Sequence, residues 1–193
     1  TPLYSSAASD VYKRQIIGGL MKPTTLVFPI DEQNRILLGR KKRGFGADKY
    51  NGFGGKINTG ESFRQCAVRE LYEESGIRVD ASALECVALF DFQFPYDESL
   101  THVGYVYFVH VTDVKPIESD EMEPHWFTLA DVPYEHMWEG DRTWLPMLLE
   151  GKLLKGPIRF GPDNSHVENM RLTEVDTVME SELLARIDVY INE

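Results

Sequence analysis

One window of the chain, from Gly55 to Ile77, constrains the fold more than any other stretch. It reads GKINTGESFRQCAVRELYEESGI, and its second half has neither glycine nor proline until Gly76. Thr59 or Ser62 can cap a helix at its start, and Gly76 can end it in a left-handed conformation. The window therefore predicts a loop, a helix over about residues 62–75, and a second loop.

The predicted helix has an apolar stripe. Phe63, Ala67 and Leu71 recur every four residues, so they share one face. Glu74 continues this stripe, which directs its carboxylate toward the protein body. An unpaired carboxylate in such a place is costly, and a bound cation removes that cost.

Three glutamates of this helix, Glu70, Glu73 and Glu74, have spacings that bring their carboxylates to one side. Carboxylates select hard cations such as Mg²⁺ or Mn²⁺, and Mg²⁺ is typically shared between a few carboxylates and substrate phosphates. The alternative is a solvated acidic helix face. Glu61 lies on about the opposite side of the helix, so we expect it to act structurally through Arg69.

The net charge of the chain is −11, which argues against binding to long nucleic acid. A small anionic substrate is compatible with this charge if cations are supplied locally. Metal ions can supply some of them, and the basic run from Arg40 to Arg43 can supply more. The alternative for this run is a solvated basic turn.

The two cysteines, Cys66 and Cys86, form neither a metal-binding spacing nor a disulfide framework. Reduced thiols and a cytoplasmic location are the simplest interpretation. The chain has no apolar stretch of the roughly 20 residues that span a bilayer, and its N-terminal residues do not resemble a secretory signal. We therefore expect no membrane association.

Three parts of the chain differ in their patterning. Residues 1–20 lack a helical or strand period, and we expect them to be a non-native or disordered leader that precedes a native start at Met21. Residues 21–178 have the pattern of one folded domain. Residues 179–193 are expected to form an amphipathic helix, because apolar residues recur there at helical spacing.

Strand patterns alternate with helical ones along the domain. Five glycines between Gly44 and Gly55 predict a loop whose backbone approaches another group closely. The strand at 102–111 is apolar on both faces, so both should be covered, and the chain should form an α/β sandwich. Strands are predicted at 24–30, 35–40, 84–94, 102–111 and 125–129, a helix at 142–150, and a hairpin of 159–160 with 167–172.

The window from Gly55 to Ile77 matches the signature of the Nudix hydrolases at every specified residue, so the chain resembles that family. The resemblance implies an α/β/α Nudix sandwich with a mixed sheet. It also implies that the loop–helix–loop holds Mg²⁺, or Mn²⁺ in its place, against a diphosphate that water then cleaves. The matching residues are Gly55, Glu61, Arg69, Glu70, Glu73, Glu74 and Gly76, together with apolar Leu71 and Ile77.

The resemblance also implies a set of metal ligands and catalytic residues. Glu121, in the stretch ESDEM, resembles the family's additional metal ligand or general base, although Glu70 or Glu73 can equally be that base. The implied metal ligands are the Gly54 carbonyl, Glu70, Glu73, Glu74 and Glu121. Arg69 completes the implied catalytic set.

Over about residues 24–178 the chain is similar to one branch of the family, which hydrolyses oxidised purine nucleoside triphosphates. Stretches such as LLGRKKRGFGADKYNGFGGK and MWEGDRTWLPMLL support this similarity. It implies a pocket in which aromatic rings stack on a purine while amide and carboxyl groups read its edge. The implied substrate-binding residues are Thr25, Lys41, Phe45, Asn51, Phe53, Gly54, Gly55, Lys56, Phe90, Phe92, Trp138, Asp141 and Trp144.

One position departs from that branch, which has two adjacent carboxylates after its first tryptophan. This chain has Gly140 followed by Asp141. The choice between 8-oxo-dGTP and 2-hydroxy-dATP therefore stays open. An aspartate in an apolar pocket can still be raised in pKa until it donates a hydrogen bond.

The resemblance, together with these patterns, implies a monomeric, Mg²⁺-dependent enzyme that sanitises the nucleotide pool. It would hydrolyse oxidised purine nucleoside triphosphates, such as 8-oxo-dGTP and 2-hydroxy-dATP, to the monophosphate and pyrophosphate. One alternative is a Nudix enzyme for ADP-ribose, a capped RNA or a methylated dGTP. The other is a catalytically silent Nudix fold that serves as a binding module.

Overall fold

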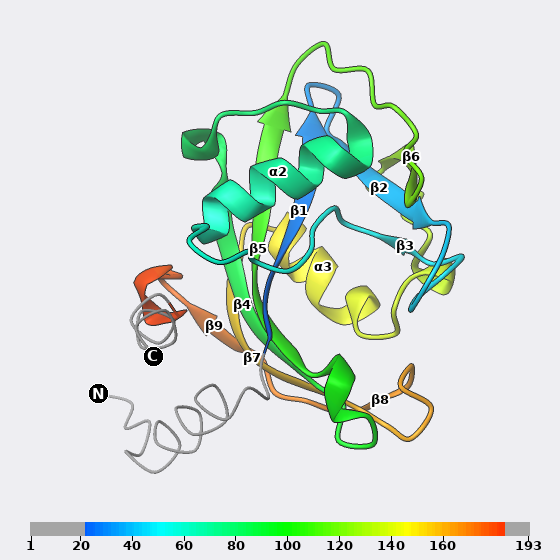
Figure 1. Cartoon of the computed structure of the whole chain (residues 1–193), viewed down its shortest axis with the longest axis vertical. Helices are drawn as coiled ribbons and strands as arrows, with labels where there is room; N and C mark the ends of the chain where they lie inside the picture. Colours follow the sequence, from blue (N-terminus) through cyan, green and yellow to red (C-terminus); the bar gives the residue numbers. More distant parts are fainter. Residues whose placement is uncertain (1–21, 184–193) are drawn as a thin grey trace.

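The computed structural model describes residues 22–183, so the predictions for residues 1–20 and for most of 179–193 lie outside it. A nine-stranded mixed sheet forms its centre (Figure 1). The strand order is β3-β2-β1-β5-β4-β7-β8, with β6 paired to β2 and β9 to β7. The strands are β1 (Lys22–Asp31), β2 (Arg35–Lys41), β3 (Tyr50–Asn51), β4 (Glu85–Gln93), β5 (His102–Val111), β6 (Met122–Thr128), β7 (Leu153–Phe160), β8 (Val167–Met170) and β9 (Thr173–Val175).

The strand directions determine where the ends of the central strands meet. β1 runs parallel to β5, β4 runs antiparallel to β5, and β7 runs parallel to β4. The first residues of β1 and β5 therefore lie at the same edge of the sheet as the last residues of β4 and β7. Side chains from four strands converge at this edge.

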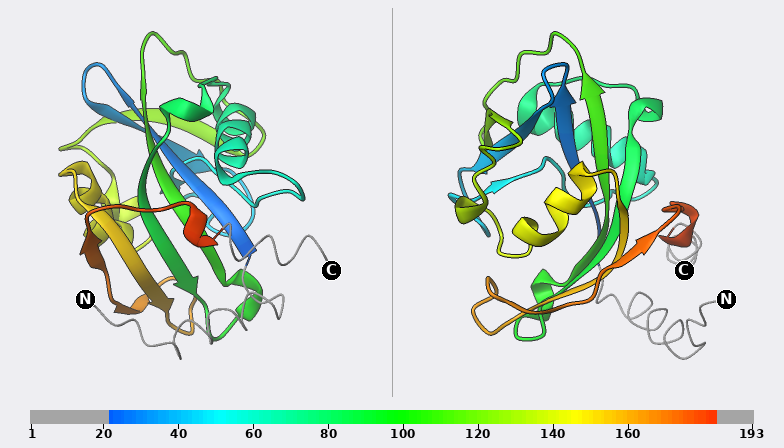
Figure 2. Two further views of the ribbon diagram at one scale, coloured as in Figure 1. Left: turned by 90° about the vertical axis from the view of Figure 1, so that its left-hand side faces the viewer. Right: turned by 180° about the vertical axis from the view of Figure 1, so that it is seen from behind.

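Among the described residues, one long helix covers each face of the sheet. Helix α2 (Phe63–Ser75) lies on the face toward the viewer in Figure 1, and helix α3 (Asp141–Leu149) lies on the opposite face, which the right-hand view of Figure 2 presents. Ser62 caps α2 in a capping box with Gln65, and Gly76 ends it with a φ of 72°. The predicted α/β sandwich is confirmed.

Two apolar clusters fill the spaces between the sheet and its helices. Phe63 and Leu71 of α2 pack against Tyr105 on one face. Trp144 of α3 packs with Phe108 on the other. The expectation that residues 102–111 are covered on both faces is therefore confirmed.

Two strands begin three or more residues earlier than the sequence pattern predicts. β6 begins at Met122 instead of residue 125 and includes Pro124. Proline is tolerated there because β6 pairs on one side only, with β2, so the missing amide need not donate a hydrogen bond. β7 begins at Leu153 instead of residue 159 and forms the expected hairpin with β8. Proline and glycine within these strands hide their length in the sequence.

The described part of the C-terminal segment packs on the same chain. The Tyr105 hydroxyl lies 3.0 Å from the Met179 carbonyl oxygen and 2.9 Å from that of Glu180, and it accepts a hydrogen bond from the Leu183 amide. Arg64 of α2 forms an ion pair of 2.7 Å with Glu180. The segment up to Leu183 thus extends the cover that α2 gives the sheet. Within residues 22–183 no helix is long and apolar enough to cross a membrane.

Candidate active site

The glycine-rich loop before α2 lies against the start of β1. The Thr25 amide donates a hydrogen bond of 2.9 Å to the Gly55 carbonyl, and Val27 and Phe53 exchange two backbone hydrogen bonds. The Gly54 amide, in contrast, points to the helix and donates a hydrogen bond of 2.8 Å to Oε2 of Glu74. The loop therefore connects the first strand to the carboxylates of α2.

Glu74 points inward, as its place on the apolar stripe predicts, and it is only 5% exposed. Burial raises its pKa to about 8, and the nearby charges of Glu70 and Glu121 add to this rise. The Gly54 hydrogen bond and the charge of Lys41 act in the opposite direction. A buried carboxylate of this kind is stabilised in its charged form by a cation.

The backbone of Gly55 lies close to the carboxylate of Glu70. A Cβ atom at position 55 would lie 2.4 Å from Oε1 and 2.8 Å from Oε2 of Glu70. A side chain at position 55 would therefore displace the Glu70 carboxylate from its place beside the loop. Burial raises the pKa of Glu70 above its ordinary value.

Arg69 connects the remaining acidic residues of the signature. It binds Glu61 through two hydrogen bonds of 2.7 and 2.9 Å, which hold the pKa of Glu61 below its usual value. It also donates to Glu70 at 2.7 Å and to Glu73 at 3.1 Å. The pairing of Glu61 with Arg69 is present as expected, and Arg69 also positions Glu70 and Glu73.

Glu121 reaches the same site from the loop before β6. Its charge contributes to the raised pKa of Glu74, while its carboxylate lies 3.1 Å from Arg43. The basic run is largely paired with acidic residues, since Lys42 contacts Glu118 at 2.6 Å in the same way. Lys41, in contrast, lines a pocket beside the site.

The acidic residues fit a divalent cation by their chemistry. In the part of the chain that the structure describes, no three Asp, Glu, His or Cys side chains stand close enough to hold a metal ion without moving. Glu70 and Glu73 are held by Arg69, and Glu74 by the Gly54 amide. The donors are all oxygen atoms, which hard dications prefer. Burial disfavours the charged forms of Glu70 and Glu74, and a bound dication would offset this cost for each of them.

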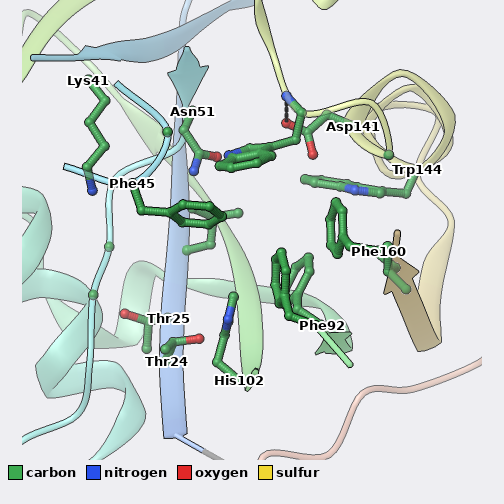
Figure 3. Close-up of a pocket in the computed structure, with 18 residues that line it drawn as sticks. Thr24, Thr25, Lys41, Phe45, Asn51, Phe92, His102, Asp141, Trp144 and Phe160 are labelled. Atoms are coloured by element: carbon green, nitrogen blue, oxygen red, sulfur yellow. Dashed lines mark hydrogen bonds between the residues drawn. The ribbon is translucent and has the colours of Figure 1, made fainter. Parts of the chain in front are cut away.

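A pocket opens next to the glycine loop, at the edge where four strands converge (Figure 3). It brings together ten of the residues expected to bind substrate. These are Thr25, Lys41, Phe45, Asn51, Gly54, Gly55, Phe92, Trp138, Asp141 and Trp144. Because Gly54 and Gly55 line this pocket and also contact Glu74 and Glu70, the pocket and the carboxylates share a wall.

Polar and aromatic groups of the pocket have distinct places. Asn51 and Asp141 lie at one end of the cavity (Figure 3). Burial raises the pKa of Asp141 to about 8, against the lowering effects of the Trp138 amide and of Lys49. The rings of Trp138 and Phe45 lie 4.8 Å apart at an angle of 37°. A planar ligand would thus meet aromatic faces and a carboxyl group that can donate a hydrogen bond.

Three residues expected to bind substrate lie elsewhere. Phe53 is fully buried in the core beneath α2, and Phe90 is fully buried behind Phe92 and Trp144. Lys56 is exposed on the loop beside Thr24 and is not part of the pocket lining. These placements correct the expected set, because resemblance alone does not separate a pocket wall from the packing behind it.

Several pocket residues were not predicted. Phe94 follows Phe90 and Phe92 at alternate positions, so the period of a strand could have indicated it. His102 and Phe160 had no comparable signal, since their positions depend on which strand ends meet. The other unpredicted lining residues are Thr24, Leu26, Gly46, Gly140 and Ile158.

Comparison with known proteins identifies the class to which this fold and site belong. Residues 20–148 match the NUDIX domain, and the chain belongs to the Nudix family. The predicted family and the predicted fold are therefore confirmed. Nudix hydrolases generally use divalent metal ions.

Two relatives share the name oxidized purine nucleoside triphosphate hydrolase. The protein from Danio rerio is 42% identical over 155 residues, which cover 80% of this chain and 96% of the relative. The protein from Mus musculus is 43% identical over 155 residues, which cover 79% and 95%. Among solved structures, a MutT protein from Bacillus halodurans superposes with a TM-score of 0.67 at 25% identity, covering 79% of this chain and 97% of that one.

Proposed function

We propose that this protein hydrolyses oxidised purine nucleoside triphosphates, such as 8-oxo-dGTP and 2-hydroxy-dATP, to the monophosphate and pyrophosphate. The observation that carries the proposal is the wall shared by the aromatic pocket and the acidic helix. Gly54 and Gly55 line the pocket, while the Gly54 amide binds Glu74. A base in the pocket would extend its phosphates toward the carboxylates. The relatives from Danio rerio and Mus musculus support the choice of substrate.

The acidic residues are proposed to hold Mg²⁺, which Mn²⁺ can replace. The ligands would be Glu70, Glu73, Glu74, Glu121 and the Gly54 carbonyl. Such a cation neutralises phosphate charge and acidifies a bound water molecule. Arg69 would keep Glu70 and Glu73 in place, because it binds both and is itself anchored on Glu61.

A carboxylate of the site is proposed to act as the general base. The base must lie within a hydrogen bond of the attacking water molecule. Glu70, Glu73 and Glu121 are the candidates, because Glu74 already accepts the Gly54 hydrogen bond and points into the core. Lys41, which lines the pocket near Glu74, would contact the phosphates.

The base would be recognised at the far end of the pocket. Asp141, with its pKa raised to about 8, retains its proton at neutral pH and can donate a hydrogen bond to an acceptor on the purine. Asn51 can add both a donor and an acceptor in one plane. Asp141 is the carboxyl group of this segment that lines the pocket. A side chain at position 140 would point toward Met170, since its Cβ would lie 3.1 Å from the Met170 methyl carbon.

Pyrophosphate release from a panel of nucleotides tests the proposal. The panel is 8-oxo-dGTP, 2-hydroxy-dATP, undamaged dGTP, a methylated dGTP, ADP-ribose and a capped RNA, each with Mg²⁺. We expect the monophosphate and pyrophosphate from an oxidised purine, at a higher kcat/KM than from dGTP. Preference for another member of the panel would replace the proposed substrate. No product from any of them would indicate a binding module.

A further inference from the structure

His102 is a polar residue in the wall of the pocket to which the proposed function gives no role. It is the first residue of β5 and faces the cavity beside Phe92 (Figure 3). Its ring stacks on Phe92 at a centroid distance of 4.7 Å and on Phe94 at 6.0 Å. Phe94 in turn stacks on Phe160 at 4.4 Å. This series of rings fixes the plane of the imidazole.

The hydrogen bonding of His102 fixes its tautomer. Nδ1 lies 2.7 Å from the carbonyl oxygen of Leu100, and because a carbonyl oxygen only accepts, Nδ1 carries the hydrogen. Burial lowers the pKa of His102, as do the charges of Lys56 and Lys22. The ring is therefore neutral at physiological pH, and Nε2 presents a lone pair. Within residues 22–183 this Nε2 atom has no hydrogen-bond partner.

The position of His102 indicates which part of a nucleotide it meets. Asn51 and Asp141 lie at one end of the cavity, whereas Thr24, Thr25 and His102 lie together at the other (Figure 3). Thr25 contacts the glycine loop through its amide. We place the edge of the base at Asn51 and Asp141 and the phosphates at the glycine loop. The sugar, which joins them, then lies on the side of the cavity that Thr24 and His102 form.

We propose that His102 accepts a hydrogen bond from a sugar hydroxyl of the bound nucleotide and so favours substrates that carry this hydroxyl. The inference rests on the proposed function, which sets the orientation of the nucleotide. A hydroxyl is the matching group, because it can donate to a neutral imidazole nitrogen. His102 is therefore a specificity-determining residue.

A comparison of two substrates and three proteins tests this inference. The substrates are 8-oxo-dGTP and its 2′,3′-dideoxy analogue, which lacks the sugar hydroxyl. The proteins are the wild type, His102→Phe, which keeps a stacking ring without an acceptor, and His102→Gln, which keeps an acceptor. Thermal unfolding checks that each variant is folded, and kcat and KM are measured separately.

We expect the wild type to lose about three- to tenfold in kcat/KM on the dideoxy substrate, mainly through KM, as for one hydrogen bond. His102→Phe should lose a similar factor on 8-oxo-dGTP and lose little more when the hydroxyl is absent. His102→Gln should keep part of the wild-type preference. If His102→Phe fails to fold, His102→Leu, which also lacks an acceptor, takes its place in the comparison.

The inference is overturned if the wild type treats both substrates alike, or if His102→Phe loses the same factor on each. Hydrolysis of 8-oxo-dGTP with such a result would leave the proposed function intact and remove only the role of His102. Absence of hydrolysis by the wild type would instead overturn the proposed function.

Discussion

The backbone amide of Gly54 donates a hydrogen bond of 2.8 Å to the buried carboxylate of Glu74, which lies 20 positions further along the chain. This contact joins the loop that lines the pocket to the helix that carries the acidic residues. It also leaves one oxygen of Glu74 free for another partner, since a carboxylate accepts at both of its oxygens. The geometry of the pocket and that of the carboxylates therefore depend on each other.

The stabilisation of the protein by Mg²⁺ should increase with pH. The pKa of Glu74 is raised from 4.5 to about 8. In the metal-free protein, the free energy of unfolding that protonated Glu74 contributes is therefore fully present below about pH 4.5 and is lost as the pH rises toward 8. A cation binds the deprotonated form, so the Mg²⁺-induced rise in Tm should grow from about pH 6 to about pH 9. Thermal unfolding with and without Mg²⁺ measures this growth.

Glu74→Gln is the matched variant for this measurement, because it keeps the size of the side chain without its titration. The variant should unfold at a higher temperature than the wild type at about pH 9 without metal, and its Mg²⁺ shift should be small and flat. An equal Mg²⁺ shift in both proteins would remove Glu74 from the ligands.

Recognition of the base should weaken above about pH 8. Asp141 carries its proton below the raised pKa of about 8 and loses the ability to donate above it. KM for 8-oxo-dGTP should therefore rise between about pH 7 and about pH 9 in the wild type, whereas Asp141→Asn, which always has a donor, should show a flatter profile. Because Glu74 titrates in the same range, only the difference between these two profiles reports on Asp141. Parallel profiles would contradict this role.

Replacement of Asn51 should affect binding more than turnover. Its side-chain oxygen accepts a hydrogen bond of 2.9 Å from the Gly52 amide, which orients the amide group in the pocket. Asn51→Ala should raise KM by about tenfold and change kcat little, as loss of a contact made equally in the ground and transition states does. Steady-state kinetics on 8-oxo-dGTP measure both constants, and an unchanged KM would remove Asn51 from the base pocket.

The C-terminal segment should stabilise the domain through Tyr105. Tyr105→Phe removes the hydroxyl that contacts Met179, Glu180 and Leu183, at a cost of about 1 kcal/mol and so about 2–4 °C in Tm. The matched control is Tyr96→Phe, since Tyr96 is exposed and makes one hydrogen bond of 3.3 Å to Glu168. Equal effects of both variants on thermal unfolding would show that the segment contributes nothing through Tyr105.

The signature window was readable from the sequence because its information is local. The spacing of Glu74 on an apolar stripe predicts that it points inward, and the helix cap at Ser62 and its end at Gly76 follow from residue type. The alternation in β5 likewise predicts that both faces of this strand are covered. Each of these features depends on neighbours only a few residues away.

The composition of the pocket was less predictable because it depends on which strand ends meet. Phe53 and Phe92 are both aromatic, yet the first lies in the core beneath α2 and the second lines the cavity. His102 enters the pocket only because β5 starts at the edge where β4 ends. No local pattern gives this meeting, which is a property of the sheet order.

The most direct test of the account is the turnover of 8-oxo-dGTP at saturating Mg²⁺ by the wild type, Glu73→Gln and Glu74→Gln, with Glu85→Gln as a control. Glu85 is an exposed residue at the start of β4, outside the proposed site. We predict that turnover falls by about two orders of magnitude or more in the two site variants, while all four proteins remain folded. Near wild-type turnover in both Glu73→Gln and Glu74→Gln would contradict the proposal that these carboxylates hold the catalytic metal.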